Sequence, residues 1–261
     1  MRPRRHTTTT ALSHTVRCRR TKEAQLDTVI YFILVPMVYI AFGVFIIGTV
    51  FRLVSIFSKP KNPSTLRIYP DKGAPWLLAT ADALFFPTIR RHKPLLWVFL
   101  VVFHIGLILL LITHLELIAE WSALQIIPHD IPMGYGFVGL SLLICLLYFL
   151  LRRFKSPVRE LSVPEDYLML ILLFLTVLFG AEMNWARTWY EYGEMGVGDY
   201  REYLYGLVTF SPELPDVTRF SGHSFMLVVH VFFANVLLML FPFSQMMHAF
   251  FSIPINKLRR G

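Results

Sequence analysis

The sequence predicts an all-α fold: a polytopic membrane bundle of five transmembrane helices. Of the 261 residues, 55% are hydrophobic and only 16% are charged, whereas about a quarter of a typical soluble domain is charged. The mean hydropathy is +0.55, and the apolar residues gather in long runs. Only helices and closed barrels satisfy the backbone inside lipid, and unbroken apolar runs lack the alternating pattern of barrel strands.

Five apolar runs meet or approach the roughly 20 residues that cross a hydrocarbon core about 30 Å thick. They cover residues 29–51, 95–117, 134–151, 167–183 and 225–243. With their connections they define a membrane domain over residues 29–255.

Two basic segments flank this domain. Residues 1–28 have no apolar periodicity, so we expect a basic leader that is disordered or precedes the true start. Residues 256–261 are expected to be a basic cytoplasmic tail.

The distribution of charge predicts the orientation in the membrane. Residues 52–93 hold eight Lys or Arg against two acids, whereas residues 119–132 hold none and residues 184–220 hold three against six acids. The positive-inside rule therefore places the N-terminus outside and the C-terminus in the cytoplasm of a cell membrane. Seven Lys or Arg within residues 1–28 oppose this orientation. The net charge of +8 thus follows the membrane and does not indicate nucleic-acid binding.

One inner connection has a different composition. Residues 74–91, APWLLATADALFFPTIRR, mix apolar and polar side chains and predict an amphipathic helix on the inner surface. This helix would serve as a docking platform for a soluble partner or as a plain lipid anchor.

The two cysteines, Cys18 and Cys145, have no spacing typical of a metal site. The chain alone is therefore not expected to ligate an iron–sulfur cluster or to form a disulfide framework.

Four histidines lie in or beside the spans, at the ends of FHIGLILLLITH and within the stretch that ends in PFSQMMHAFF: His104, His114, His230 and His248. Ionisable groups in a membrane are costly and usually functional. A hydrogen-bonded core histidine would explain any one of them. Four histidines on two helices are harder to explain in that way.

Their spacing suggests two pairs. His104 and His114 are about 15 Å apart along a helix, and the antiparallel fifth span places His230 opposite His114 and His248 opposite His104. Two cross-helix imidazole pairs at two depths are what two stacked b-type haems require. A straight helix would separate His230 and His248 by about 27 Å, so Pro242 is predicted to bend or break it.

The same stretches resemble the nitrate reductase gamma subunit (cytochrome b) family. They are most similar to the membrane cytochrome b subunits of heterodisulfide-reductase-like menaquinol oxidoreductases associated with dissimilatory sulfite reduction. The resemblance implies two haem b groups, with His104 and His248 on the inner iron and His114 and His230 on the outer one. Thr113 departs from the family pattern, which has a glycine before the second histidine.

The resemblance also implies an activity. Menaquinol would be oxidised near the outer face, and electrons would pass through the stacked haems to an iron–sulfur, heterodisulfide-reductase-like subunit on the cytoplasmic side. The chain would then be the quinol-oxidising subunit of a multi-subunit respiratory oxidoreductase.

A quinol site needs a proton acceptor near the outer haem. Glu116, two residues beyond His114, is the first candidate, although interfacial polar residues are common at helix ends. The other candidates are Glu120, Gln125, His129, Asp130 and Glu182. Haem propionates would need cations, for which Arg90, Arg91, Arg152 and Arg153 are placed, unless these arginines only follow the positive-inside bias.

Two other functions remain open from the residues alone. A proton-coupled transporter would use the membrane histidines as a relay, although the sequence lacks the repeated halves typical of transporters. A cofactor-free membrane anchor would use only the basic inner loops.

Overall fold

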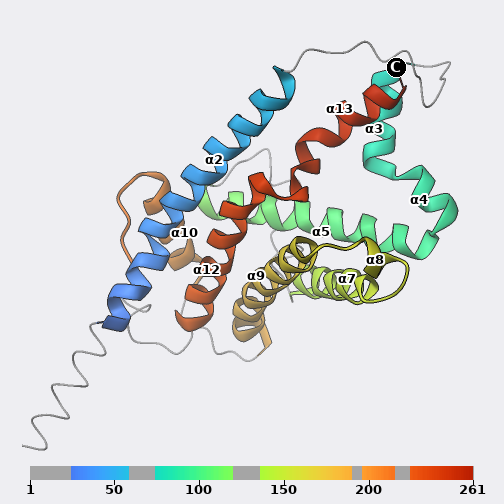
Figure 1. Ribbon diagram of the computed structural model, residues 1–261. Coiled ribbons are helices and arrows are strands. Elements are labelled where there is room, and N and C mark those ends of the chain that lie inside the picture. The colour runs from blue at the N-terminus through green and yellow to red at the C-terminus, as the bar shows by residue number, and fades with distance from the viewer. Residues whose placement is uncertain (1–24, 59–73, 120–135, 190–195, 215–223, 261) are drawn as a thin grey trace, which may run out of the picture.

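The computed structural model of the chain describes residues 25–58, 74–119, 136–189, 196–214 and 224–260. These residues form helices and no strand (Figure 1). The helices are α2 (Pro36–Phe57), α3 (Pro75–Phe85), α4 (Pro87–His92), α5 (Pro94–Ile118), α7 (Phe137–Arg153), α8 (Val158–Leu161), α9 (Pro164–Trp189), α10 (Val197–Val208), α12 (Ser224–Leu240), the 3₁₀ turns η1 (Phe241–Phe243) and η2 (Gln245–Met247), and α13 (His248–Arg260).

Four helices in the described part of the chain are long and apolar enough to cross a membrane: Gln25–Phe57, Pro94–Ile118, Pro164–Ala186 and Phe225–Phe243. They coincide with four of the five predicted runs and make the chain a multi-pass membrane protein. The remaining run forms α7, whose 17 residues extend about 26 Å. That length falls short of a hydrocarbon core of about 30 Å. Most of the predicted leader, residues 1–24, lies outside the described residues.

Helix packing places α5 and α12, which carry three of the four histidines, against different neighbours. α12 packs along α9 and α2, whereas α5 packs along α7 and α10, and α7 packs on α9. Leu142 and Leu146 of α7 and Val177 and Ala181 of α9 belong to one cluster of buried apolar residues. α5 and α12 are thus supported by different helices, and the rings of His114 and His230 meet between them.

The first apolar helix is kinked at Pro36. Proline has no backbone N–H and disrupts the helix turn that precedes it. The Val38 N–H consequently bonds the Val35 carbonyl at 3.1 Å, which frees the Leu34 carbonyl. The buried Tyr203 hydroxyl of α10 donates to that oxygen at 2.6 Å, and the Asn235 amide of α12 donates to the Ile33 carbonyl at 3.1 Å.

These bonds attach α10 to the first apolar helix. Tyr39 donates a reciprocal bond to the Leu207 carbonyl at 2.9 Å, and its ring stacks on Phe210 with centroids 5.5 Å apart. Burial, with nearby Tyr39, raises the pKa of Tyr203 and so keeps its hydroxyl protonated as a donor. Other elements satisfy the polar groups that the kink exposes, as lipid requires.

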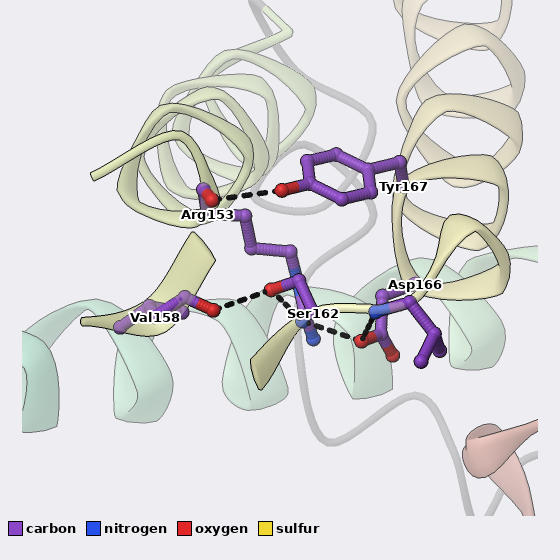
Figure 2. Close-up of polar contacts among 6 residues, drawn as sticks. Arg153, Val158, Ser162, Asp166 and Tyr167 are labelled. Atoms are coloured by element: carbon purple, nitrogen blue, oxygen red, sulfur yellow. Dashed lines mark hydrogen bonds and ion pairs between the residues drawn. The ribbon is translucent and has the colours of Figure 1, made fainter. Parts of the chain in front are cut away.

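A polar cluster holds the ends of α7 and α9 together (Figure 2). The Arg153 guanidinium donates to the Asp166 carboxylate at 2.8 Å and to the Ser162 hydroxyl at 3.1 Å. The Val163 N–H donates to the same carboxylate at 3.1 Å, and Tyr167 donates to the Arg153 carbonyl at 2.8 Å. Arg153, considered above for a haem propionate, is therefore engaged in an ion pair.

The expected helix over residues 74–91 is two helices, α3 and α4. They are divided at Phe86, whose φ of 45° is left-handed. α3 packs against α13, and the Lys257 ammonium lies 4.1 Å from the centroid of the Trp76 ring. Leu77 and Phe85 are exposed on α3. The helical part of the prediction is confirmed, and a docking or anchoring role stays a prediction.

Replacing Arg153 by methionine should lower the free energy of unfolding by about 1–3 kcal/mol, because the largely buried Asp166 carboxylate loses a charged hydrogen-bond donor. Arg159→Met is the matched control: its side chain is 66% exposed and 4.0 Å from Glu160. Denaturant titration in detergent measures both variants. Equal stability of the two would contradict the role given to the cluster.

Tyr203→Phe should destabilise the protein by about 1–3 kcal/mol, since it leaves the buried Leu34 carbonyl without its donor. Tyr205→Phe on the exposed side of α10 provides the control. Thermal unfolding in the same detergent distinguishes them, and an unshifted melting temperature for Tyr203→Phe would show that the kink does not depend on this bond.

Candidate functional site

Four imidazole rings face one another in two pairs between the helices that carry them. The ring centroids of His104 and His248 are 6.3 Å apart, with planes at 81°. Those of His114 and His230 are 6.2 Å apart, with planes at 23°. The structure therefore brings together the residues that the spacing had paired.

Each ring is oriented by a hydrogen bond from Nδ1 to a backbone carbonyl. His104 and His114 bond the carbonyls one turn earlier on α5, of Leu100 and Leu110, both at 2.7 Å. Since a carbonyl only accepts, Nδ1 carries the proton. The basic lone pair of each ring is then on Nε2.

His230 and His248 also carry the proton on Nδ1, but they bond carbonyls in other parts of the fold. His230 bonds the Thr176 carbonyl of α9 at 2.8 Å, and His248 bonds the Gln245 carbonyl at 3.0 Å. A histidine that ligates a metal usually donates its other N–H in this way, which fixes its tautomer and orientation.

The predicted break at Pro242 is confirmed and places His248. α12 ends at Leu240, η1 and η2 follow, and α13 begins at His248. Ser244 caps η2, with its hydroxyl accepting from the Met246 N–H at 3.2 Å. A continuous helix would have separated the two histidines of this region by about 27 Å, and the break removes that mismatch.

The paired rings fit a metal held between them. An imidazole–metal bond is about 2.0–2.1 Å long, and ring bonds near 1.35 Å place a nitrogen about 1.1 Å from its ring centroid. Two rings on opposite sides of one metal therefore have centroids about 6.3 Å apart. The observed 6.3 and 6.2 Å agree with that value.

The donor set favours haem iron over a bare metal ion. Within the residues that the structure describes, no three His, Cys, Asp or Glu side chains are grouped to hold a metal. A haem iron needs only two protein ligands, because the porphyrin occupies the other positions. Aromatic rings lie beside the pair of His104 and His248: Phe86 and Phe103 have centroids 5.5 and 5.3 Å from that of His104.

Comparison with known proteins agrees with this geometry. The family model described as nitrate reductase gamma subunit matches residues 89–261, a region that includes all four histidines. The chain belongs to the nitrate reductase gamma subunit family.

Two relatives of this family member carry the name Hdr-like menaquinol oxidoreductase cytochrome b-like subunit. The protein from Archaeoglobus fulgidus is 29% identical over 85% of this chain and 76% of its own length. The protein from Archaeoglobus profundus is 23% identical over 83% of this chain and 75% of its own length.

Glu116 lies near the C-terminal end of α5 in this gamma-family chain. It is 2% exposed and follows His114 by two residues. Its helix packs against α10, the described helix of the predicted outer loop 184–220. Glu182 lies on α9 and is half-buried, whereas Glu120, Gln125, His129 and Asp130 fall outside the described residues.

Several contributors to the site were not predicted from the sequence. They are the Thr176 carbonyl, the glycines that adjoin His230 and Pro242, and the Tyr203–Leu34 bond. A carbonyl carries no signal in a sequence, and one glycine in an apolar helix looks like any other. Only Pro36, a proline inside an apolar run, could have marked the kink.

Proposed function

We propose that this gamma-family protein is the dihaem b subunit of a respiratory oxidoreductase that oxidises menaquinol near the outer face of the cytoplasmic membrane. The observation that carries the proposal is the geometry of the two imidazole pairs, His104 with His248 and His114 with His230. Each ring has Nδ1 bonded to a carbonyl, and the centroids of each couple are separated as two ligands of one iron would be.

The residues divide into an inner and an outer site. His104 and His248 would hold one haem b near the cytoplasm, and His114 and His230 would hold the second nearer the outer face. Bound between these ligands, haem iron supplies reversible one-electron transfer. The chain itself fixes the orientation of each ring through the Nδ1 hydrogen bonds, and it places Phe86 and Phe103 beside His104.

Glu116 is the proposed proton acceptor for menaquinol. Oxidation of the quinol to the quinone releases two protons and two electrons, and a carboxylate at the site can take one proton as the hydroxyl loses it. Glu116 is buried and lies at the same end of α5 as His114, which supports this role. The electrons would leave toward the inner pair.

The orientation and the partner form part of the same proposal. Five spans, with α7 crossing a locally thinned part of the bilayer, would place the N-terminus outside and the C-terminus in the cytoplasm. The partner would be an iron–sulfur, heterodisulfide-reductase-like subunit at the basic inner face. The names of the two Archaeoglobus relatives, which refer to a menaquinol oxidoreductase, support this assignment.

The purified protein should show reduced-minus-oxidised bands of b-type haem, with two haems per chain. His114→Ala or His230→Ala should remove the outer haem and leave the inner one, because each change deletes one of the two residues that would hold the outer haem alone. Pyridine haemochrome quantification and redox titration measure the outcome. A colourless protein would instead favour a transporter or a cofactor-free anchor, and survival of both haems in either variant would refute the pairing.

Glu116→Gln should slow reduction of the haems by a menaquinol analogue about 10²-fold or more, the usual contribution of a positioned general base. The visible spectrum and haem content should not change. Glu165→Gln is the control, because Glu165 is an exposed carboxylate at the N-terminal end of α9. Stopped-flow reduction distinguishes the two, and an unchanged rate in Glu116→Gln would remove this residue from the proton path.

A further inference from the structure

We propose that two glycines outside the histidine-bearing helices, Gly180 of α9 and Gly48 of α2, are positioning residues, each acting on one of the two haem sites. The inference rests on the proposed haem ligation. Gly180 would set the outer ligand His230, and Gly48 would set the inner ligand His248 through Pro242.

Gly180 lies directly against the imidazole of His230. A Cβ at this position would be 2.9 Å from Cε1 and 3.1 Å from Nδ1 of that ring. Thr176, whose carbonyl accepts the Nδ1 proton at 2.8 Å, lies one turn earlier on the same helix. The ring therefore reaches the backbone of α9 only because residue 180 has no side chain.

His230 depends on a neighbouring helix in a way that the other three rings do not. His104 and His114 bond carbonyls of their own helix, and His248 bonds a carbonyl three residues earlier. A shift between α9 and α12 would thus move the ring of His230 and leave the hydrogen bonds of the others in place. An alanine methyl at residue 180 would force that shift, because the ring cannot move away from the methyl without lengthening its bond to the Thr176 carbonyl.

Gly48 makes an equally close contact with the break before His248. A Cβ there would be 2.9 Å from both Cβ and Cγ of Pro242, and 3.5 Å from Cζ of Phe243. The pyrrolidine ring is rigid and Pro242 is fully buried, so it cannot rotate away. An added methyl would push η1 from α2 and, through Ser244 and η2, displace His248.

The two sites can be monitored separately by the relative orientation of their ligands. The imidazole planes are near-parallel in the outer pair, at 23°, and near-perpendicular in the inner pair, at 81°. Parallel planes split the two iron d orbitals that overlap with the ligand π systems, whereas perpendicular planes leave them close in energy. The oxidised protein should therefore give two different low-spin electron paramagnetic resonance signals.

The test compares four alanine variants of the full chain: Gly180→Ala, Gly48→Ala, Gly206→Ala and Gly43→Ala. Gly206 of α10 is the packing control, because its Cβ would meet the Ser211 carbonyl oxygen at 2.9 Å, as tightly as the other two contacts, and neither residue contacts Gly180, Gly48 or Pro242. Gly43 of α2 is the open control, with nothing within 4 Å of an added Cβ. The measurements are haem content, midpoint potentials and the two resonance signals.

Gly180→Ala should weaken haem retention at the outer site about 10–100-fold, the usual cost of disturbing a ligand's supporting contact. It should also alter the near-parallel signal and leave the near-perpendicular one unchanged. Gly48→Ala should do the reverse, and both controls should match the wild type.

Two results would overturn the inference. Either Gly180→Ala and Gly48→Ala behave like Gly206→Ala, or each variant loses both haems or its fold, which would indicate a general packing defect. Because Gly180→Ala and Gly48→Ala act on different sites, each variant tests its own site even if the other variant fails to fold. A wild-type protein without haem would instead refute the proposed function itself.

Discussion

An imidazole in hydrocarbon has two nitrogens, and an unsatisfied buried polar group costs several kcal/mol. His104, His114 and His230 lie within the spans and His248 lies just beyond the last one, and all four satisfy Nδ1 with a backbone carbonyl and therefore present Nε2. For the three within the spans, lipid offers Nε2 no partner, so it must find one within the bundle. The rings form two pairs whose centroids lie 6.2 and 6.3 Å apart, a separation at which a metal fits between them. The break before His248, the glycine contacts at His230 and Pro242, and the packing of α5 and α12 against different helices hold the rings at these positions.

The two couples arise from helices with unequal spacing. On α5 the histidines are ten residues apart and both use the regular hydrogen-bond geometry of one helix. The other two are eighteen residues apart, and no straight helix could oppose both to α5. The 3₁₀ turns after Leu240 interrupt the helix, and Ser244 starts the second of these turns. In straight helices the two histidine separations, about 15 and 27 Å, would differ by about 12 Å. The break removes this difference and lets both rings meet the rings of α5.

Hydropathy alone predicted four of the spans, and the spacing of His104, His114, His230 and His248, with Pro242, predicted which rings would meet. Those signals are local: a run of apolar residues, a count of residues, a proline. The third run, over residues 134–151, forms a helix of 17 residues that begins at Phe137, after the left-handed Gly136. Hydropathy alone does not specify where such a helix begins. The bond from His230 to Thr176 joins residues 54 apart and depends on how two helices pack. Tyr203 and Leu34 are 169 apart, and their bond exists only because Pro36 frees a carbonyl, so neither could be deduced from sequence.

The helix that carries His230 is also the element through which the two sites are tied to the rest of the fold. On one side α12 contacts α9, where Thr176 and Gly180 receive His230. On the other it contacts the first apolar helix, where Asn235 bonds the Ile33 carbonyl and the turn after α12 places Pro242 on Gly48. The supporting helices α2 and α9 contain none of the four histidines. Interiors are close-packed and transmit displacement, so the positions of His230 and His248 are set by different neighbouring helices. The spacing between the two imidazole pairs, on which the proposed electron transfer would depend, is then a property of three helices and not of one.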